Sequence, residues 1–173
     1  THECNLACTY CYTGEKFRRE MDWPTAMSSL DLLFNAPREQ TPWRDEAPVD
    51  LGFFGGEPLI CFDMMERVSH EARDRAAREG RRLRLAVTTN GTLVTPERAR
   101  RLAALGVQVT LSLDGCREAH EATRPQRGGR FHVDPDGRVA AAVDPGQHLV
   151  QHGDGIEAPP VGVPQARDPP VQG

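Results

Sequence analysis

The sequence predicts an α/β protein with a parallel sheet, and three observations lead to this fold class. Apolar runs of strand length alternate with segments of helical periodicity between residues 49 and 113. The links between them are short, and most contain glycine. No long unpatterned loop interrupts the alternation. Since parallel strands are joined by helical crossovers, this order indicates right-handed βαβ units with helices packed on the sheet.

The first unit begins at residue 49. "VDLGFF" at 49–54 is a short apolar run that stops at a glycine, and residues 63–80 then have helical periodicity. Asp63 is placed to cap this helix, with Glu66 three residues on, and Gly80 is placed to end it. The helix carries an apolar stripe of Met65, Val68, Ala72 and Ala76.

The second unit repeats the pattern. "LRLAVTT" at 83–89 has the composition of a buried strand. Thr95 followed by Pro96 is typical of a helix N-terminus, with a threonine cap and a proline at the first helical position. "VQVTLSL" at 107–113 is the next strand, and residues 22–35 form a further helix before the first strand.

Composition narrows the class of protein. At 173 residues the chain suits one domain, and a net charge of -4 gives no electrostatic footprint for nucleic acid. No apolar stretch has membrane-span or signal-peptide character, so we expect a cytoplasmic protein without a membrane partner. Five cysteines, three of them clustered, fit a reduced compartment and a metal site better than a disulfide framework.

The C-terminal part differs from the rest. Seven of the fourteen prolines and six of the sixteen glycines lie in residues 133–173, without aromatic residues or apolar periodicity. Such a composition is typical of disorder. We therefore predict a domain over 1–131 and a disordered tail over 132–173.

Three polar turns follow the three predicted strands: "GGEP" at 55–58, "TTNG" at 88–91 and "SLDG" at 112–115. Parallel strands bring the segments after their carboxyl ends to one edge of the sheet, where ligands bind. Taken singly, each turn is more often only a turn. Together they predict a set of ligand-binding residues: Gly55, Gly56, Glu57, Asn90, Ser112 and Asp114.

The cysteines at the start of the chain give the sharper signal. Cys4, Cys8 and Cys11 are spaced so that three thiolates can converge on one soft metal centre. Three cysteines on a cubane iron–sulfur cluster leave one iron without a protein ligand. The alternative is a structural zinc site with His2 as the fourth ligand. Cys61 and Cys116 are expected to be small apolar residues.

These motifs resemble those of a known family. "CNLACTYCY" resembles the CxxxCxxC loop of the radical S-adenosylmethionine (radical SAM) enzymes, and "FFGGEPL", "TTNGTL" and "SLDG…H…RP" follow in that family's order. The resemblance covers residues 1 to about 131. It is strongest to the sulfatase-maturase and peptide-maturase branch, whose members carry an auxiliary-cluster (SPASM-type) domain.

The resemblance implies a partial TIM-like (β/α) barrel and a set of ligand contacts. Cys4, Cys8 and Cys11 would bind a [4Fe-4S] cluster whose open iron takes S-adenosylmethionine. The turn Gly55, Gly56 and Glu57 would hold the methionyl ammonium, and Tyr10 would lie near the adenine. The ribose or carboxylate would be contacted by Ser112, Asn90, Asp114 and Arg124.

The implied chemistry is reductive cleavage of S-adenosylmethionine to a 5′-deoxyadenosyl radical. Its substrate would be a peptide or protein side chain, and its partner a one-electron donor of the flavodoxin or ferredoxin type. Because the sequence starts at the cysteine loop, where the family has a preceding strand, we expect a fragment, and the alternatives are a zinc-binding module or an inactive remnant. No catalytic acid or base stands out, since His120, Glu121 and Lys16 are expected at the surface.

Overall fold

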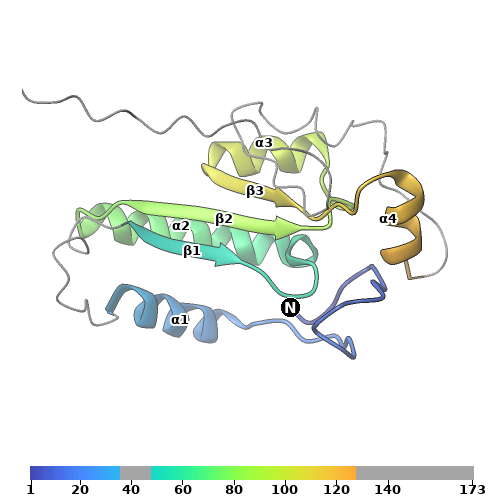
Figure 1. The fold of residues 1–173 in the computed structure, drawn as a ribbon. Coiled ribbons are helices and arrows are strands. Elements are labelled where there is room, and N and C mark those ends of the chain that lie inside the picture. The colour runs from blue at the N-terminus through green and yellow to red at the C-terminus, as the bar shows by residue number, and fades with distance from the viewer. Residues whose placement is uncertain (36–47, 128–173) are drawn as a thin grey trace, which may run out of the picture.

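The computed structural model describes residues 1–35 and 48–127, and its centre is a three-stranded parallel sheet (Figure 1). The strands are β1 (Val49–Phe53), β2 (Leu83–Thr89) and β3 (Val107–Leu111), in the order β1-β2-β3. The predicted α/β class with parallel strands is confirmed. The tail predicted over 132–173 lies outside the described residues.

Helices connect and flank the strands. They are α1 (Trp23–Asn35), the 3₁₀ turn η1 (Pro58–Cys61), α2 (Phe62–Arg78), α3 (Pro96–Ala104) and α4 (Arg117–Thr123). In Figure 1, α2 and α3 lie along one side of the sheet, and α4 lies beyond the carboxyl ends of the strands. Of the described helices, none is long and apolar enough to cross a membrane.

The core lies on the helix-covered face of the sheet. Val87 and Val109 point toward α2 and α3, and they pack with Phe62, Met65 and Leu102. A second apolar cluster joins α1 and α2 beside β1. Burial along β2 alternates from residue to residue, so this strand is buried on one face and not on both. The opposite face carries small and polar residues: Asp50, Gly52, Arg84, Ala86, Thr88, Gln108 and Thr110.

Two local predictions were wrong. Asp63 does not cap α2, because the helix starts at Phe62 and directly continues η1, whose own first turn is capped by Glu57. The third strand ends at Leu111 and not at residue 113, because the chain turns there toward α4. The cap of α3 is confirmed, since the Thr95 hydroxyl accepts a hydrogen bond from the backbone N–H of Arg98 at 3.2 Å.

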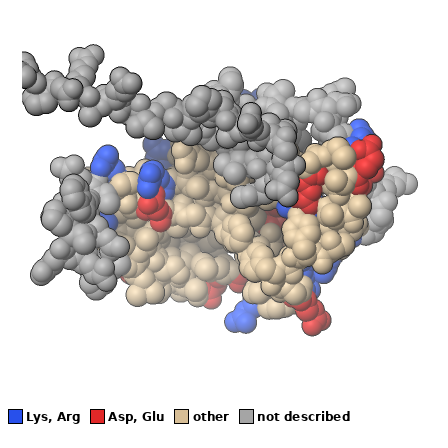
Figure 2. All heavy atoms as spheres, in the orientation of Figure 1, with Lys and Arg blue, Asp and Glu red and all other residues tan. Residues whose placement is uncertain are grey.

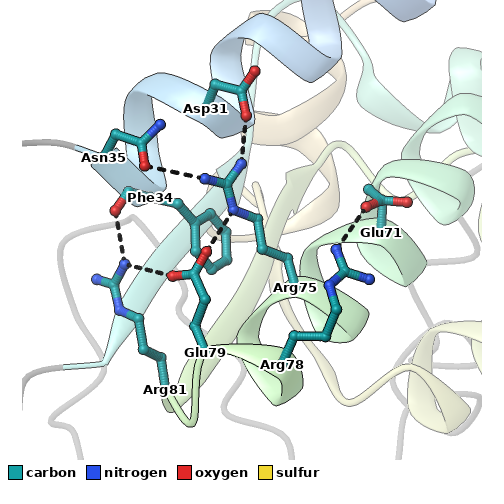
Figure 3. A network of polar contacts seen from close by, with 8 residues as sticks. All are labelled: Asp31, Phe34, Asn35, Glu71, Arg75, Arg78, Glu79 and Arg81. Atoms are coloured by element: carbon teal, nitrogen blue, oxygen red, sulfur yellow. Dashed lines mark hydrogen bonds and ion pairs between the residues drawn. The ribbon is translucent and has the colours of Figure 1, made fainter.

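Helices α1 and α2 are joined by polar contacts near their carboxyl ends (Figure 3). Arg75 on α2 donates hydrogen bonds to Asp31 and to Asn35 Oδ1 on α1, and it pairs with Glu79 at 2.9 Å. Arg81 donates to the carbonyl of Phe34 at 2.9 Å. This carbonyl belongs to the last turn of α1, where carbonyls lack helical partners, so Arg81 satisfies one of them. On the face drawn in Figure 2, the charged side chains of the described residues gather in small groups of both signs.

Candidate functional site at the carboxyl ends of the strands

The three polar turns lie together at the carboxyl edge of the sheet, and hydrogen bonds join them in order. The turn after β1 reaches the turn after β2, because the Glu57 carboxylate accepts a hydrogen bond from the backbone N–H of Asn90 at 2.8 Å. The turn after β3 reaches β2 in the same way, with Ser112 N–H donating to the Thr89 carbonyl at 2.9 Å. Sequence-distant motifs therefore form one surface.

Glu57 is the buried centre of this edge, with 1% of its surface exposed. One carboxylate oxygen accepts hydrogen bonds from Leu59 N–H at 3.0 Å and the Thr89 hydroxyl at 2.6 Å, and the other accepts from Asn90 N–H. Burial raises the pKa of Glu57, and these three donors oppose the rise. Its carboxylate is thus engaged within the protein, where it fixes the turns after β1 and β2.

The glycine pair before Glu57 makes room for the start of the chain. Gly56 N–H donates to the Thr1 carbonyl at 2.9 Å, and Glu57 N–H donates to the Glu3 carbonyl at 2.8 Å. A Cβ atom on Gly56 would lie 2.1 Å from the Glu3 carbonyl oxygen, which no side chain could tolerate. Gly55 has φ +146°, and a Cβ there would lie 2.7 Å from the Thr1 carbonyl oxygen. The sequence predicted that these glycines let a ligand approach the backbone closely. In the structure, the backbone at the start of the chain approaches them instead.

Residues 4–11, the cysteine loop, continue from this paired segment. Cys4 is buried, while Cys8 and Cys11 are half-buried. The Asn90 side-chain amide lies 3.7 Å from Cys4 Sγ and donates to Asn5 Oδ1 at 3.0 Å. The turn after β2 therefore contacts the beginning of the cysteine loop directly.

A second segment binds the same loop from the other side. Residues 123–127, the pairing segment, run antiparallel to residues 5–9. Ala7 N–H donates to the Pro125 carbonyl at 2.7 Å and Thr9 N–H to the Thr123 carbonyl at 2.9 Å. The "RP" of the fourth motif thus lies in backbone contact with the cysteine loop.

Three predicted site residues meet at Asp114. Its carboxylate accepts hydrogen bonds from the Tyr10 hydroxyl at 2.5 Å and from Arg124 Nε at 2.9 Å. Tyr10 is 55% exposed, and the partial burial of its hydroxyl together with the hydrogen bond to Asp114 raises the pKa of Tyr10 to about 12. Burial alone would raise the pKa of Asp114, but its hydrogen bonds from Thr123, Tyr10 and Arg124 outweigh burial and lower it.

His120 is not the surface residue that the sequence indicated. Only 5% of it is exposed, and its Nδ1 accepts a hydrogen bond from Asp114 N–H at 3.2 Å. This contact requires a lone pair on Nδ1, so the neutral ring carries its proton on Nε2. Burial, followed by the charge of Arg124, lowers the pKa of His120. His120 therefore holds the turn after β3 against α4.

Positive charges flank the cysteine loop. Burial raises the pKa of Cys8, and the neighbouring thiols of Cys4 and Cys11 add to the rise, whereas Arg124 and Lys16 oppose it. The pKa of Cys11 is lowered, because hydrogen bonds from Thr13 and the nearby Lys16 outweigh its burial. Lys16 also donates a hydrogen bond to the Leu6 carbonyl at 2.9 Å, which connects the segment after the cysteine loop to the loop itself.

The donor set fits the predicted soft-metal centre by its chemistry. Three thiols lie on one loop, those of Cys4 and Cys11 act electrostatically on Cys8, and the cations Arg124 and Lys16 oppose the rise of its pKa. Within the described residues, no group of three or more His, Cys, Asp or Glu side chains is gathered closely enough to hold a metal ion. His2, the proposed fourth zinc ligand, instead stacks on the ring of Phe17 at 4.4 Å.

Comparison with known proteins identifies the family. Residues 1–133 match the sequence model of the radical SAM superfamily. The chain belongs to this superfamily. Enzymes of the radical SAM superfamily use a [4Fe-4S] cluster and S-adenosylmethionine, as the motifs implied. Membership favours an iron–sulfur cluster over a structural zinc site.

Named relatives share the same region. The chain is 33% identical over 132 residues to Fe-coproporphyrin III synthase of Methanosarcina barkeri, covering 74% of this chain and 29% of the relative. It is 32% identical over 127 residues to the serine-type anaerobic sulfatase-maturating enzyme of Bacteroides thetaiotaomicron, covering 73% and 30%. A solved structure of anSMEcpe with bound AdoMet superposes with a TM-score of 0.64 at 25% identity, covering 82% of this chain and 37% of that one. The chain thus spans about a third of these proteins.

Several residues that build this site had no role in the sequence analysis. They are the polar side chains that carry the contacts between motifs: Asn5, Thr89, Thr92 and Thr123. Each lies inside or beside a motif, and this position is the only feature of the sequence that could have indicated a role at the site. Their partners lie as many as 87 residues away, as for Asn5 and Thr92, and such pairing is invisible to local pattern.

Proposed function

We propose that this chain is the cofactor-binding part of a radical SAM enzyme, with Cys4, Cys8 and Cys11 holding a [4Fe-4S] cluster and S-adenosylmethionine bound beside it. When bound and reduced, the cluster supplies the electron that cleaves S-adenosylmethionine to methionine and a 5′-deoxyadenosyl radical. The observation that carries the proposal is the meeting of the three strand-end turns at the start of the chain. The turns after β2 and β3 contact the cysteine loop through Asn90 and Asp114, and Glu57 in the turn after β1 contacts Asn90 and the Glu3 carbonyl just before the loop.

The chain's own residues supply orientation and charge. Asn90 holds the start of the cysteine loop, and Gly56 permits the close approach of the preceding segment. Arg124 and Lys16 place positive charge beside thiolates, which favours the charged ligand set. The side chains of Ser112 and Asn90 and the turn at Gly55 stand at this edge as the proposed contacts for S-adenosylmethionine.

The proposed substrate is a peptide or protein side chain, and the proposed electron source is a flavodoxin- or ferredoxin-type protein. Support for the substrate comes from the sulfatase-maturating relative. The synthase relative is named for a porphyrin, so the family's shared region serves different substrates. Since the chain spans about a third of each relative, substrate recognition is proposed for the whole protein and radical formation for the region described here.

Product formation tests this proposal. The anaerobically reconstituted, dithionite-reduced chain should release 5′-deoxyadenosine from S-adenosylmethionine, measured by chromatography. Cys8→Ala should abolish the release, and Cys116→Ala, which changes an exposed cysteine outside the loop, should retain it. A fully loaded cluster without any 5′-deoxyadenosine would contradict radical formation and favour the alternative of an inactive remnant.

A further inference from the structure

We propose that Asp114 is a positioning residue, whose carboxylate holds Tyr10 of the cysteine loop and Arg124 of the pairing segment together instead of contacting S-adenosylmethionine. The contacts that support this inference lie within the chain itself. Only the expected effect on S-adenosylmethionine binding rests on the proposed function. It assigns to Asp114 a role different from the cofactor contact that the family resemblance implies.

The carboxylate of Asp114 has little capacity left for a ligand. Oδ2 accepts from the Tyr10 hydroxyl at 2.5 Å and lies 2.6 Å from the Thr123 hydroxyl, whose single proton is shared with the Ala119 carbonyl at 2.8 Å. Oδ1 accepts from Arg124 Nε at 2.9 Å. A carboxylate offers about four lone-pair sites, and protein donors face three of them. Only 17% of the Asp114 side chain is exposed.

These donors come from two separate parts of the chain. Tyr10 lies between two of the proposed cluster ligands, while Thr123 and Arg124 begin the pairing segment. The Arg124 guanidinium also stands over the Tyr10 ring, 5.3 Å from its centroid, so the cation contacts both the carboxylate and its partner Tyr10. Asp114 therefore joins the turn after β3, the end of α4 and the cysteine loop at one point.

Backbone contacts continue from this point along the loop. Thr9 N–H and Ala7 N–H donate to the carbonyls of Thr123 and Pro125, and Arg127 N–H donates to the Asn5 carbonyl at 3.0 Å. Cys8 stands between Ala7 and Thr9, inside the stretch that these bonds fix. Loss of the Asp114 carboxylate would release Tyr10 and Arg124 together, and the pairing of residues 5–9 would open more often.

Hydrogen exchange tests this without any cofactor. In the full chain before reconstitution, Asp114→Asn should speed exchange of the Ala7 and Thr9 amides by about 10-fold, because a hydrogen bond to a charged group is lost. The amide of Val87 in the core should not change. Asp63→Asn is the control, since 95% of the Asp63 side chain is exposed. Unchanged exchange at Ala7 and Thr9 would overturn the proposal.

A milder variant covers the case in which Asp114→Asn unfolds the chain, which faster exchange at Val87 would reveal. Tyr10→Phe keeps the ring and the Asp114–Arg124 pair and removes only the hydroxyl. It should speed exchange at Thr9 by about 3- to 10-fold with Val87 unchanged, and no effect at Thr9 would overturn the proposal.

Cofactor binding distinguishes positioning from direct contact. On reconstituted protein, Asp114→Asn and Tyr10→Phe should each weaken S-adenosylmethionine binding, and the double variant should bind within about 2-fold of Asp114→Asn alone, because both remove one shared interaction. Effects that multiply would place Asp114 on the cofactor and overturn the proposal. If the wild-type chain binds no S-adenosylmethionine, the proposed function fails, and the exchange experiment still decides the role of Asp114.

Discussion

Glu57 and Asp114 are two carboxylates of one site whose pKa values are shifted in opposite directions. Both carboxylates accept three contacts from protein donors. Burial dominates at Glu57, whose donors are neutral groups, and its pKa rises. At Asp114 the donors include the Arg124 cation, and the pKa falls despite burial. A charged donor stabilises the ionised form more than neutral donors do.

The lowered pKa of Asp114 predicts a specific dependence of stability on pH. The folded pKa lies below the unfolded value of about 3.9, so ionised Asp114 stabilises the fold above that pH and the stabilisation is lost as pH falls through the folded pKa. Asp114→Asn should lower the free energy of unfolding at pH 7 by about 1–3 kcal/mol and show a smaller loss in acid. Urea denaturation from pH 7 to 3 measures this.

The groups that face Asp114 define the control for this experiment. The titratable groups among them are Tyr10, Arg124 and His120, and of these only His120 changes charge on the way from pH 7 to 3. Both proteins retain His120, whose pKa is lowered by burial but raised by the Asp114 charge, so the difference between the two curves reports Asp114 together with this coupling. Parallel curves from pH 7 to 3 would contradict the assignment.

At the scale of elements, the pattern of the sequence predicted the strands and helices well. β1, β2, α1, α2 and α3 all lie within a few residues of their predicted positions. The predicted cap at Asp63 failed, since Glu57 caps η1 and the helix continues from it. The prediction for His120 was wrong for a related reason. Its burial depends on the packing of α4 against a turn, and a helix of seven residues is too short for its periodicity to indicate a buried face.

The sequence predicted which residues lie at the candidate site better than it predicted the contacts between them. Glycine-bearing turns after parallel strands indicated the edge, and the structure joins them there. The internal bonding of Glu57 and the tie between Tyr10 and Asp114 span 33 and 104 residues. Local sequence carries no signal for such distant pairs, so only the folded chain identifies them.

The glycine pair gives a prediction for the link between β1 and the cysteine loop. Gly56→Ala should displace the Glu3 segment, because the new Cβ would lie 2.1 Å from the Glu3 carbonyl oxygen. We expect a loss of 2 kcal/mol or more, on the order of a core disruption, in thermal or urea unfolding. Gly52→Ala is the matched control within β1, where a Cβ meets nothing within 4 Å. Equal effects of the two substitutions would refute the close-approach explanation.

The junction of α1 and α2 gives a second prediction at this scale. Arg75 contacts Asp31, Asn35 and Glu79, so Arg75→Ala should lower the free energy of unfolding measurably and by more than a surface substitution does. Arg78→Ala is the control, because Arg78 is 64% exposed and has one 3.3 Å contact with Glu71. Its effect should stay within about 0.5 kcal/mol. An effect of Arg78→Ala as large as that of Arg75→Ala would contradict the role assigned to the junction.

At the scale of the whole molecule, the described sheet has one helix-covered face and one polar face. The polar face includes the Asp50–Arg84 pair with Thr88 and Thr110, and its carboxyl edge carries the candidate site. In the described part of the chain, β1 and β3 are the outer strands of the sheet. This arrangement matches the part of the radical SAM fold that the chain shares with its longer relatives.

The proposed function requires that Cys4, Cys8 and Cys11 form a [4Fe-4S] site beside a binding site for S-adenosylmethionine. Electron paramagnetic resonance of the anaerobically reconstituted and reduced chain, before and after addition of S-adenosylmethionine, tests it most directly. We expect a [4Fe-4S] signal that changes on addition, is absent in Cys8→Ala and persists in Cys61→Ala. Stoichiometric zinc binding without cluster formation, or a cluster signal that S-adenosylmethionine leaves unchanged, would contradict it.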